Sequence, residues 1–345
     1  MRILLSGCVL LLTYFTALTA FASSTDKSNS SAETSAVAPS IDLLPASLLQ
    51  ISETEAFSKF VLLVDKEQRK LTVFERDGEQ IKKLQEYPAD IGKNGGNKTK
   101  RDDARTPEGI YFLEKRLTQP EIPFNLYGAL AFTTNYPNLF DRRQNKTGSG
   151  IWLHAIPDTV ALTRGSRGCV VVRNEVIKKL ADYIKLRETP ILIFDHVNYL
   201  PKIEHEKLRM SLNSFIEGWR QAWESQDIDK YISYYDKDFE APGFNLNSWK
   251  AHKANLKSKY EFIKVHLSQP YIVQHNDQLL VKTLQRYESD KHVDYGVKTI
   301  YAIKSGDSFK IIREEWLPFN EKEVSAAIAR DNSITAQATA GQQTQ

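Results

Sequence analysis

Hydrophobic side chains change their spacing near residue 205, and this change divides the chain into two regions. Before it, short apolar runs of strand length, such as residues 60–64 and 191–194, are separated by Gly and Pro turn signals. After it, apolar residues from Leu208 to Trp223 recur at three- and four-residue steps, which is typical of an amphipathic helix. The sequence therefore predicts a mostly β domain followed by an α+β domain.

The first domain is expected to span residues 59–197. Its one clear helix is predicted at residues 175–187, and Asn174 is well placed to cap it. The expected strands are residues 60–64, 70–76, 110–113, 150–154 and 191–194.

The second domain is expected to span residues 205–320, after a linker near residues 196–206. Helices come first and a meander of strands follows, an order that indicates an α+β layer. The predicted helices are residues 208–223, 228–235 and 246–260, and the predicted strands are residues 262–266, 271–275, 278–287, 293–303 and 309–316.

Both ends of the chain are expected to lie outside these domains. Residues 1–22 are predicted to be a secretory signal peptide, because an apolar stretch ends in the small-x-small cleavage pattern Ala20 to Ala22. A retained membrane anchor is the alternative, since a span of ~20 apolar residues crosses a bilayer. Residues 23–58 are expected to be a flexible linker and residues 321–345 a disordered tail. Either form of the signal places the protein in the periplasm or cell envelope.

The formal net charge of the 345 residues is only +3. A nucleic-acid-binding protein would show a clustered basic patch, so we expect no nucleic-acid partner. The histidines of the second domain show no metal-ligand spacing, and we expect no metal site there. Mild basicity suits work beside an anionic cell wall.

Cys169 is the only cysteine left once a signal peptide carrying Cys8 is removed. In an oxidising compartment it can therefore form no intrachain disulfide and no Cys-rich metal site. A free cysteine is often a small buried hydrophobe. By count alone, packing and chemistry are equally good interpretations of Cys169.

The residues around Cys169 favour chemistry. His154 ends a strand-like segment, and Cys169, the last residue of Ser166-Arg167-Gly168-Cys169, lies fifteen residues after it. A thiol needs a base to become a thiolate near neutral pH, and an imidazole supplies it. Glycine before the nucleophile lets the backbone turn sharply, so that N–H groups can point at a developing oxyanion.

Together, the segment Thr106 to Tyr111, the His154 strand and the Ser166 to Cys169 motif resemble the L,D-transpeptidase (YkuD) catalytic domain. The resemblance covers residues 60–196. It implies a mostly β domain in which a cysteine thiolate attacks the carbonyl between meso-diaminopimelate and the terminal D-alanine of a peptidoglycan tetrapeptide stem. D-Alanine leaves and an acyl-enzyme forms.

The resemblance leaves the acyl acceptor open. A diaminopimelate amine, or the lysine of a wall-anchored lipoprotein, would complete transpeptidation, whereas water would complete an L,D-carboxypeptidase reaction. It assigns His154 as base and then acid, the Ala155 carbonyl as the group that orients the imidazole, and the N–H groups of Gly168 and Cys169 as oxyanion donors. No metal or organic cofactor is implied. A noncatalytic wall-binding scaffold with the same fold is the alternative from another class.

Two positions depart from the family pattern. Ala155 replaces a glycine after the histidine, and Val171 replaces an arginine two residues after the cysteine. The missing arginine puts the usual substrate contacts in doubt. The expected substrate-binding residues are therefore Arg164, Arg167 and Arg173, together with Ser166 and Tyr127.

Residues 127–138 are similar to a subgroup that contains a cell-shape L,D-carboxypeptidase. The start of the second domain resembles a cone-shaped fold of the nuclear-transport-factor-two type. Its aromatics Trp219, Tyr231 and Trp249 would either line a pocket for a glycan or peptide or belong to the core of a packing or dimerisation domain. A homodimer through this domain is thus one open prediction.

Overall fold

The computed structural model describes residues 43–342 except 53 and 79, with side chains through residue 333. The predicted signal peptide and most of the predicted linker therefore lie outside the described residues. No helix among the described residues is long and apolar enough to cross a membrane.

An eight-stranded sheet builds the first domain, in the order β5-β4-β3-β10-β6-β7-β8-β9. Only the pairs β3–β10 and β8–β9 are parallel. Its strands are β3 (Phe60–Asp65), β4 (Lys70–Asp77), β5 (Gln80–Pro88), β6 (Gly109–Leu117), β7 (Ala131–Thr134), β8 (Trp152–Ile156), β9 (Val170–Arg173) and β10 (Pro190–Phe194). Three short helices accompany the sheet: α1 (Phe124–Tyr127), α2 (Leu139–Arg143) and α3 (Asn174–Ala181).

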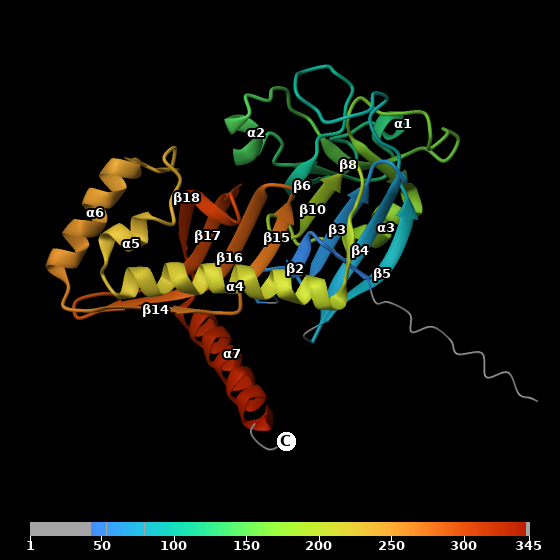
Figure 1. The fold of residues 1–345 in the computed structure, drawn as a ribbon. Helices are drawn as coiled ribbons and strands as arrows, with labels where there is room; N and C mark the ends of the chain where they lie inside the picture. Colours follow the sequence, from blue (N-terminus) through green and yellow to red (C-terminus); the bar gives the residue numbers. More distant parts are fainter. Residues whose placement is uncertain (1–42, 53, 79, 343–345) are drawn as a thin grey trace, which may run out of the picture. The chain divides into compact units, whose positions relative to one another are not determined.

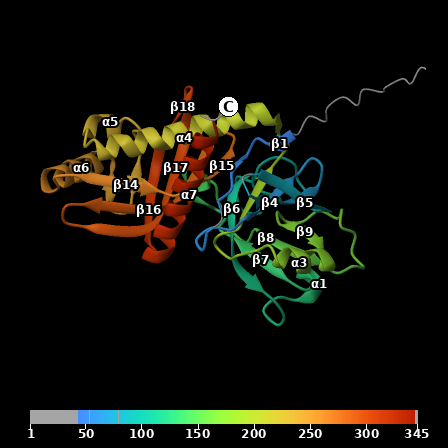
Figure 2. The ribbon, with the colours of Figure 1, turned by 90° about the horizontal axis from the view of Figure 1, so that it is seen from below.

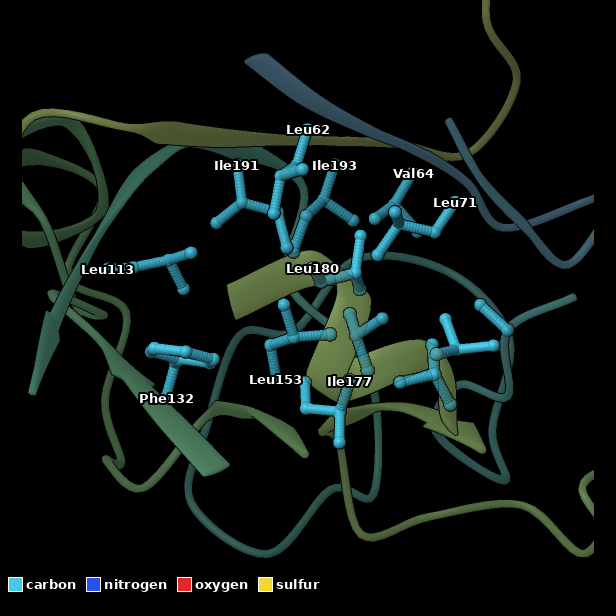
Figure 3. Packing of buried hydrophobic residues seen from close by; sticks show 14 of the residues in the cluster. Leu62, Val64, Leu71, Leu113, Phe132, Leu153, Ile177, Leu180, Ile191 and Ile193 are labelled. Atoms are coloured by element: carbon cyan, nitrogen blue, oxygen red, sulfur yellow. The ribbon is translucent and has the colours of Figure 1, made fainter. Parts of the chain in front are cut away.

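The core of the first domain lies between the sheet and α3. Figure 3 shows Ile177 and Leu180 of α3 facing Leu62 and Ile193 of the sheet, and all four side chains are fully buried. Strand β10 is buried at every position, which explains why its sequence is a continuous apolar run. This packing fixes β8 and β9, the two strands that carry the residues next to the predicted nucleophile.

The second domain is a six-stranded sheet covered by helices. The path β18-β17-β16-β15-β2 forms most of it, where β2 is Leu48–Gln50, and β14 pairs with β16. Helix α4 runs along the sheet, with α5 and α6 beside its C-terminal end (Figures 1 and 2). The elements are α4 (Lys202–Glu224), α5 (Ile228–Ile232), β12 (Glu240–Ala241), β13 (Phe244–Asn245), α6 (Leu246–Lys259), β14 (Ile263–Leu267), β15 (Tyr271–His275), β16 (Gln278–Ser289), β17 (Val293–Ser305) and β18 (Ser308–Pro318).

Trp219 and Tyr231 are core residues of the second domain. They are 2% and 0% exposed, and Trp219 Nε1 donates to Tyr235 Oη at 3.0 Å. Trp249 is partly buried against the same cluster. Of the two interpretations open from the sequence, packing therefore describes Trp219 and Tyr231.

The predicted linker 23–58 is wrong for its C-terminal part, which is folded. Strands β1 (Leu43–Pro45) and β2 (Leu48–Gln50) lie there, and β2 adds to the edge of the second sheet beside β15. Leu48 and Leu49 point to opposite faces of that strand, and both are 0% exposed. Leu48 belongs to a cluster shared by residues of both domains, so the segment joins the two.

Two further connections differ from prediction. The linker near residues 196–206 contains β11 (Tyr199–Pro201), which pairs with β1, and the start of α4. The disordered tail predicted at 321–345 is instead helix α7 (Glu321–Gln342). Val324 and Ala327 of α7 are buried in the shared cluster. This burial stabilises the helix, and the tail's polar composition does not predict it.

The predicted helix 175–187 ends early, at Ala181. The chain then turns back to the sheet, where Arg187 N donates to Leu113 O at 2.6 Å. Asn174 does not cap the helix. Its side chain accepts from Ala129 N at 2.7 Å and donates to Ile156 O at 3.1 Å, so it ties the loop before β7 and the start of α3 to the end of β8.

Candidate active site

Cys169 and His154 line one cleft of about 490 Å³. The walls come from the loop at 98–102, from α1, from the segment 148–151 and from the loop that precedes β9. The lining residues are Lys98, Arg101, Asp102, Leu126, Tyr127, Gly148, Ser149, Gly150, Ile151, His154, Arg164, Ser166, Arg167 and Cys169.

His154 lies in the middle of β8 and is 4% exposed. Its Nδ1 donates to the Ala155 carbonyl at 2.6 Å, which leaves Nε2 without a proton and able to accept one. The edge of the Tyr127 ring packs on the imidazole, with ring centres 5.1 Å apart. Burial lowers the pKa of His154 to about 4, and nearby Arg164 adds to this effect.

Cys169 is the last residue of the loop between β8 and β9. Its Sγ lies 3.5 Å from the Gly150 carbonyl. Burial raises the pKa of the Cys169 thiol to about 11, while Arg167 and Lys98 act against this rise. At neutral pH both pKa shifts favour a thiol and a neutral imidazole in the resting protein.

Ser166 closes the nucleophile loop, defined as residues 164–169, on itself. Its Oγ accepts from Gly168 N at 3.0 Å and donates to the Cys169 carbonyl at 2.7 Å. The Gly168 N–H is thus engaged inside the loop. Of the two N–H groups predicted as oxyanion donors, only that of Cys169 has no partner among the described residues.

Gly168 is required by the shape of this loop. Its φ is +130°, and a Cβ there would lie 2.7 Å from the Arg105 carbonyl oxygen and 3.0 Å from Ile151 Cδ1. The glycine therefore allows the backbone of the nucleophile loop to lie directly on the segment before Thr106.

Gly168→Ala is expected to strain the loop by about 1–3 kcal/mol and to slow Cys169 chemistry roughly a hundredfold, because the clash must move the nucleophile. Site-resolved alkylation of Cys169 measures the rate and thermal unfolding measures the strain. Gly78→Ala is the matched control, since Gly78 also has positive φ but open space around its Cα. An alanine variant at 168 that reacts like the control would contradict this prediction.

Two of the three predicted arginines reach the cleft. Arg164 and Arg167 line it, and Arg167 forms an exposed ion pair with Asp102 at 3.5 Å. Arg173 does not line it: its Nη1 donates to the Val160 carbonyl at 2.7 Å, so it anchors the connection after β8. Val171 is 1% exposed within β9 and pairs in register with His154.

Lys98 and Arg101 also line the cleft and were not predicted from the sequence. Lys98 is 3% exposed, and its Nζ donates to Asp103 at 2.7 Å and to the Lys100 carbonyl at 2.9 Å. Thr147 N donates to the Thr99 carbonyl at 3.0 Å and holds this loop against the other cleft wall. The basic run after Gly95-Gly96 was the available signal.

A larger cavity of about 580 Å³ lies between the β4–β5 hairpin and the start of α4. Its one imidazole, His205, is engaged through Nε2 with the Leu48 carbonyl at 2.8 Å. We assign the candidate active site to the smaller cleft because a cysteine thiol and an imidazole both line it. Among the described residues, no cluster of His, Cys, Asp and Glu side chains could hold a metal ion.

Comparison with known proteins agrees with the two-domain fold described above. The family model of the L,D-transpeptidase catalytic domain matches residues 59–193, and that of the Cds6 C-terminal NTF2-like domain matches residues 211–315. No curated protein sequence matches the chain.

Two solved structures cover most of the chain. Bd1075 of Bdellovibrio bacteriovorus is 79% identical, with a TM-score of 0.76, over 81% of this chain and 100% of that one. The helical cell shape determining protein Pgp2 of Campylobacter jejuni is 25% identical, with a TM-score of 0.62, over 78% of this chain and 95% of that one. The predicted fold class and family are therefore confirmed. The chain belongs to the L,D-transpeptidase (YkuD) family and carries an NTF2-like domain after the catalytic domain.

Proposed function

We propose that the protein is an exported cysteine acyl-transfer enzyme that cleaves the meso-diaminopimelate–D-alanine bond of peptidoglycan tetrapeptide stems. The observation that carries this proposal is that Cys169 and His154 line the same cleft. A retained thiol, a base of fixed tautomer and a glycine shaped to the loop have no use in a noncatalytic scaffold.

The geometry supports a two-step reaction. His154 Nε2 takes the thiol proton as Cys169 Sγ bonds to the stem carbonyl carbon, and the Cys169 N–H faces the developing oxyanion. The tetrahedral intermediate collapses, the C–N bond breaks, and His154 returns the proton to the departing D-alanine amine. A thioester on Cys169 remains. The Ala155 carbonyl holds the imidazolium in position while it carries the proton.

The charge of the cleft suits an anionic donor peptide. Four of its lining side chains are basic, Lys98, Arg101, Arg164 and Arg167, and Asp102 is acidic. Tetrapeptide stems carry several carboxylates, so electrostatic complementarity favours their approach. Arg164 and Arg167 take the place of the arginine that Val171 replaces.

The same charge favours water as the acyl acceptor. An acceptor amine approaches as an ammonium ion near neutral pH. Lys98 pairs with Asp103 and Arg167 with Asp102, but Arg101 and Arg164 leave the cleft wall with an excess of positive charge that repels the ammonium ion. Water is neutral and meets no such barrier. L,D-carboxypeptidase activity, which trims tetrapeptide to tripeptide, is therefore the favoured outcome, with transpeptidation onto a stem or onto a wall-anchored lipoprotein as the second candidate.

Trimming of stems would act on cell shape by removing the donors for later cross-linking. The name of the Campylobacter relative, a helical cell shape determining protein, supports this role. Export follows from the predicted signal peptide at residues 1–22. A homodimer through the second domain stays a prediction.

Incubation of the purified protein with a tetrapeptide muropeptide tests the reaction. We expect tripeptide and free D-alanine by mass analysis, in equal amounts, because one bond is cleaved per turnover. Cross-linked dimers would identify transfer instead. Binding to isolated sacculi with no change in stem peptides would overturn the enzymatic proposal.

A further inference from the structure

Asp90 is a buried carboxylate directly beside the nucleophile loop. It is 1% exposed, and its Oδ2 accepts from Gly165 N at 2.8 Å. Its Oδ1 accepts from Ile91 N at 2.9 Å and from the Arg69 guanidinium. The carboxylate thus holds the first turn of the nucleophile loop, where Gly165 has a φ of +83°.

The backbone around Asp90 is also bonded to both ends of that loop. Asp90 N donates to the Val171 carbonyl at 2.7 Å, and Val171 N donates back to the Asp90 carbonyl at 2.8 Å. Ser166 N donates to the Ile91 carbonyl at 2.7 Å. The segment beginning at Asp90 therefore acts as an additional strand that clamps the residues before and after Cys169.

This pairing places Asp90 in line with the catalytic base. Asp90 pairs with Val171, and Val171 pairs in register with His154 on β8. Residues paired across neighbouring strands project to the same face, and two strand spacings separate Asp90 from His154 by roughly 10 Å. The intervening Val171 is buried and apolar, so it does not screen the charge as an arginine there would.

Few charged groups face His154. Arg164 from the nucleophile loop and Asp90 from the clamping segment act on it with opposite sign, and Cys169 is its reaction partner. Tyr127 from α1 covers the His154 ring. The residues paired with His154 on β7 and β9 are Ala131 and Val171, and both are apolar. The charges that act on Cys169 are Arg167 and Lys98. Asp90 therefore acts on the base more than on the nucleophile.

We propose that Asp90 is a positioning residue that orders the nucleophile loop through Gly165 and favours the imidazolium form of His154 while Cys169 is a thiolate. Moving the proton from sulfur to His154 creates an anion and a cation, and a nearby fixed anion stabilises the cation. The ion pair with Arg69 weakens the electrostatic effect of Asp90 on His154, because the guanidinium and the carboxylate act on His154 with opposite sign. This role rests on the proposed function of the Cys169–His154 pair.

Two substitutions should change His154 in opposite directions. Asp90→Asn removes the anion, so we expect the pKa of His154 to fall and Cys169 alkylation at pH 7 to slow roughly tenfold, the equivalent of one pKa unit. Arg69→Gln removes the compensating cation, so we expect the pKa of His154 to rise and alkylation to stay the same or quicken. The Arg69 side chain is 37% exposed, so its loss should not prevent folding.

The experiment is an NMR titration of His154 together with iodoacetamide alkylation, resolved to the Cys169 peptide by mass spectrometry. Asp141→Asn is the matched control: Asp141 is also 1% exposed and bonded to a cation, Lys146, but lies outside the cleft. Opposite pKa shifts in the two variants, with none in the control, support the proposal. Unchanged pKa values, or shifts in the same direction, overturn it. If Asp90→Asn does not fold, the proposal is judged on Arg69→Gln alone, which must raise the pKa of His154. Neither readout uses peptidoglycan, so failure of the muropeptide assay would not affect this result.

Discussion

Cys169→Ala is expected to abolish conversion of tetrapeptide to tripeptide, with a loss of at least about a thousandfold, while the protein remains folded. Cys169 is the only thiol among the described residues that line the cleft, and removing a catalytic nucleophile leaves only the small contribution of binding and oxyanion contacts. The Cys169 side chain is half-buried, so its truncation should cost little stability. Muropeptide analysis and thermal unfolding measure the two effects.

His154→Ala should reduce turnover comparably, because Cys169 and His154 act as a unit and their losses are not additive. The double variant is therefore expected to be no worse than either single one. His196→Ala is the matched control, since its imidazole is exposed and paired with Glu67 at 2.7 Å, away from the cleft. Full activity in the Cys169 variant would refute the acyl-enzyme mechanism.

The buried strands were predictable because burial on both faces forces a continuous apolar sequence. β10 and the second-domain strand β15 have the predicted positions for this reason. β5 was missed because it is the edge strand of its sheet and is exposed or half-buried throughout, with Lys, Gln and Glu along it. Its order comes from hydrogen bonds to β4, and these leave no apolar pattern in the sequence.

The centre of the site could be predicted because its key residues lie close together along the chain. His154 and Cys169 are joined by one loop, and the glycine before the cysteine signals the turn that the structure contains. Arg173 was predicted by proximity to Cys169 alone, but it occupies the end of β9 and anchors a neighbouring connection. Lys98 and Asp90 act on the site through tertiary contacts, which no local pattern reveals.

The N-terminal segment at residues 23–58 is a second case in which tertiary contacts, and not a local sequence pattern, determine the structure. Its Ser- and Thr-rich composition predicts a flexible linker, yet β2 completes the edge of the second sheet. A three-residue strand such as Leu48–Gln50 carries too little periodicity to be recognised. Its stability comes from two cores that exist only after both domains have folded.

Leu49→Ala should therefore destabilise both domains together. Leu49 is 0% exposed in the core of the second domain, and such truncations cost about 2–5 kcal/mol. Because Leu48, its neighbour, is buried in the cluster that both domains share, loosening β2 removes contacts on the catalytic side as well. We expect one unfolding transition, shifted to lower urea concentration.

Two probes report the domains separately in the same titration. Tryptophan fluorescence follows the second domain, which holds four of the five tryptophans, and hydrogen–deuterium exchange of the buried strand β10, read by mass spectrometry, follows the catalytic domain. Leu43→Ala is the control, because Leu43 lies on the adjacent β1 but is 53% exposed. If the fluorescence transition moved while the exchange of β10 did not, the two domains would unfold independently. Coincident shifts of the two unfolding transitions would mean that β2 couples the stability of the catalytic domain to that of the NTF2-like domain. A ligand that stabilises the second domain would then also stabilise the active site.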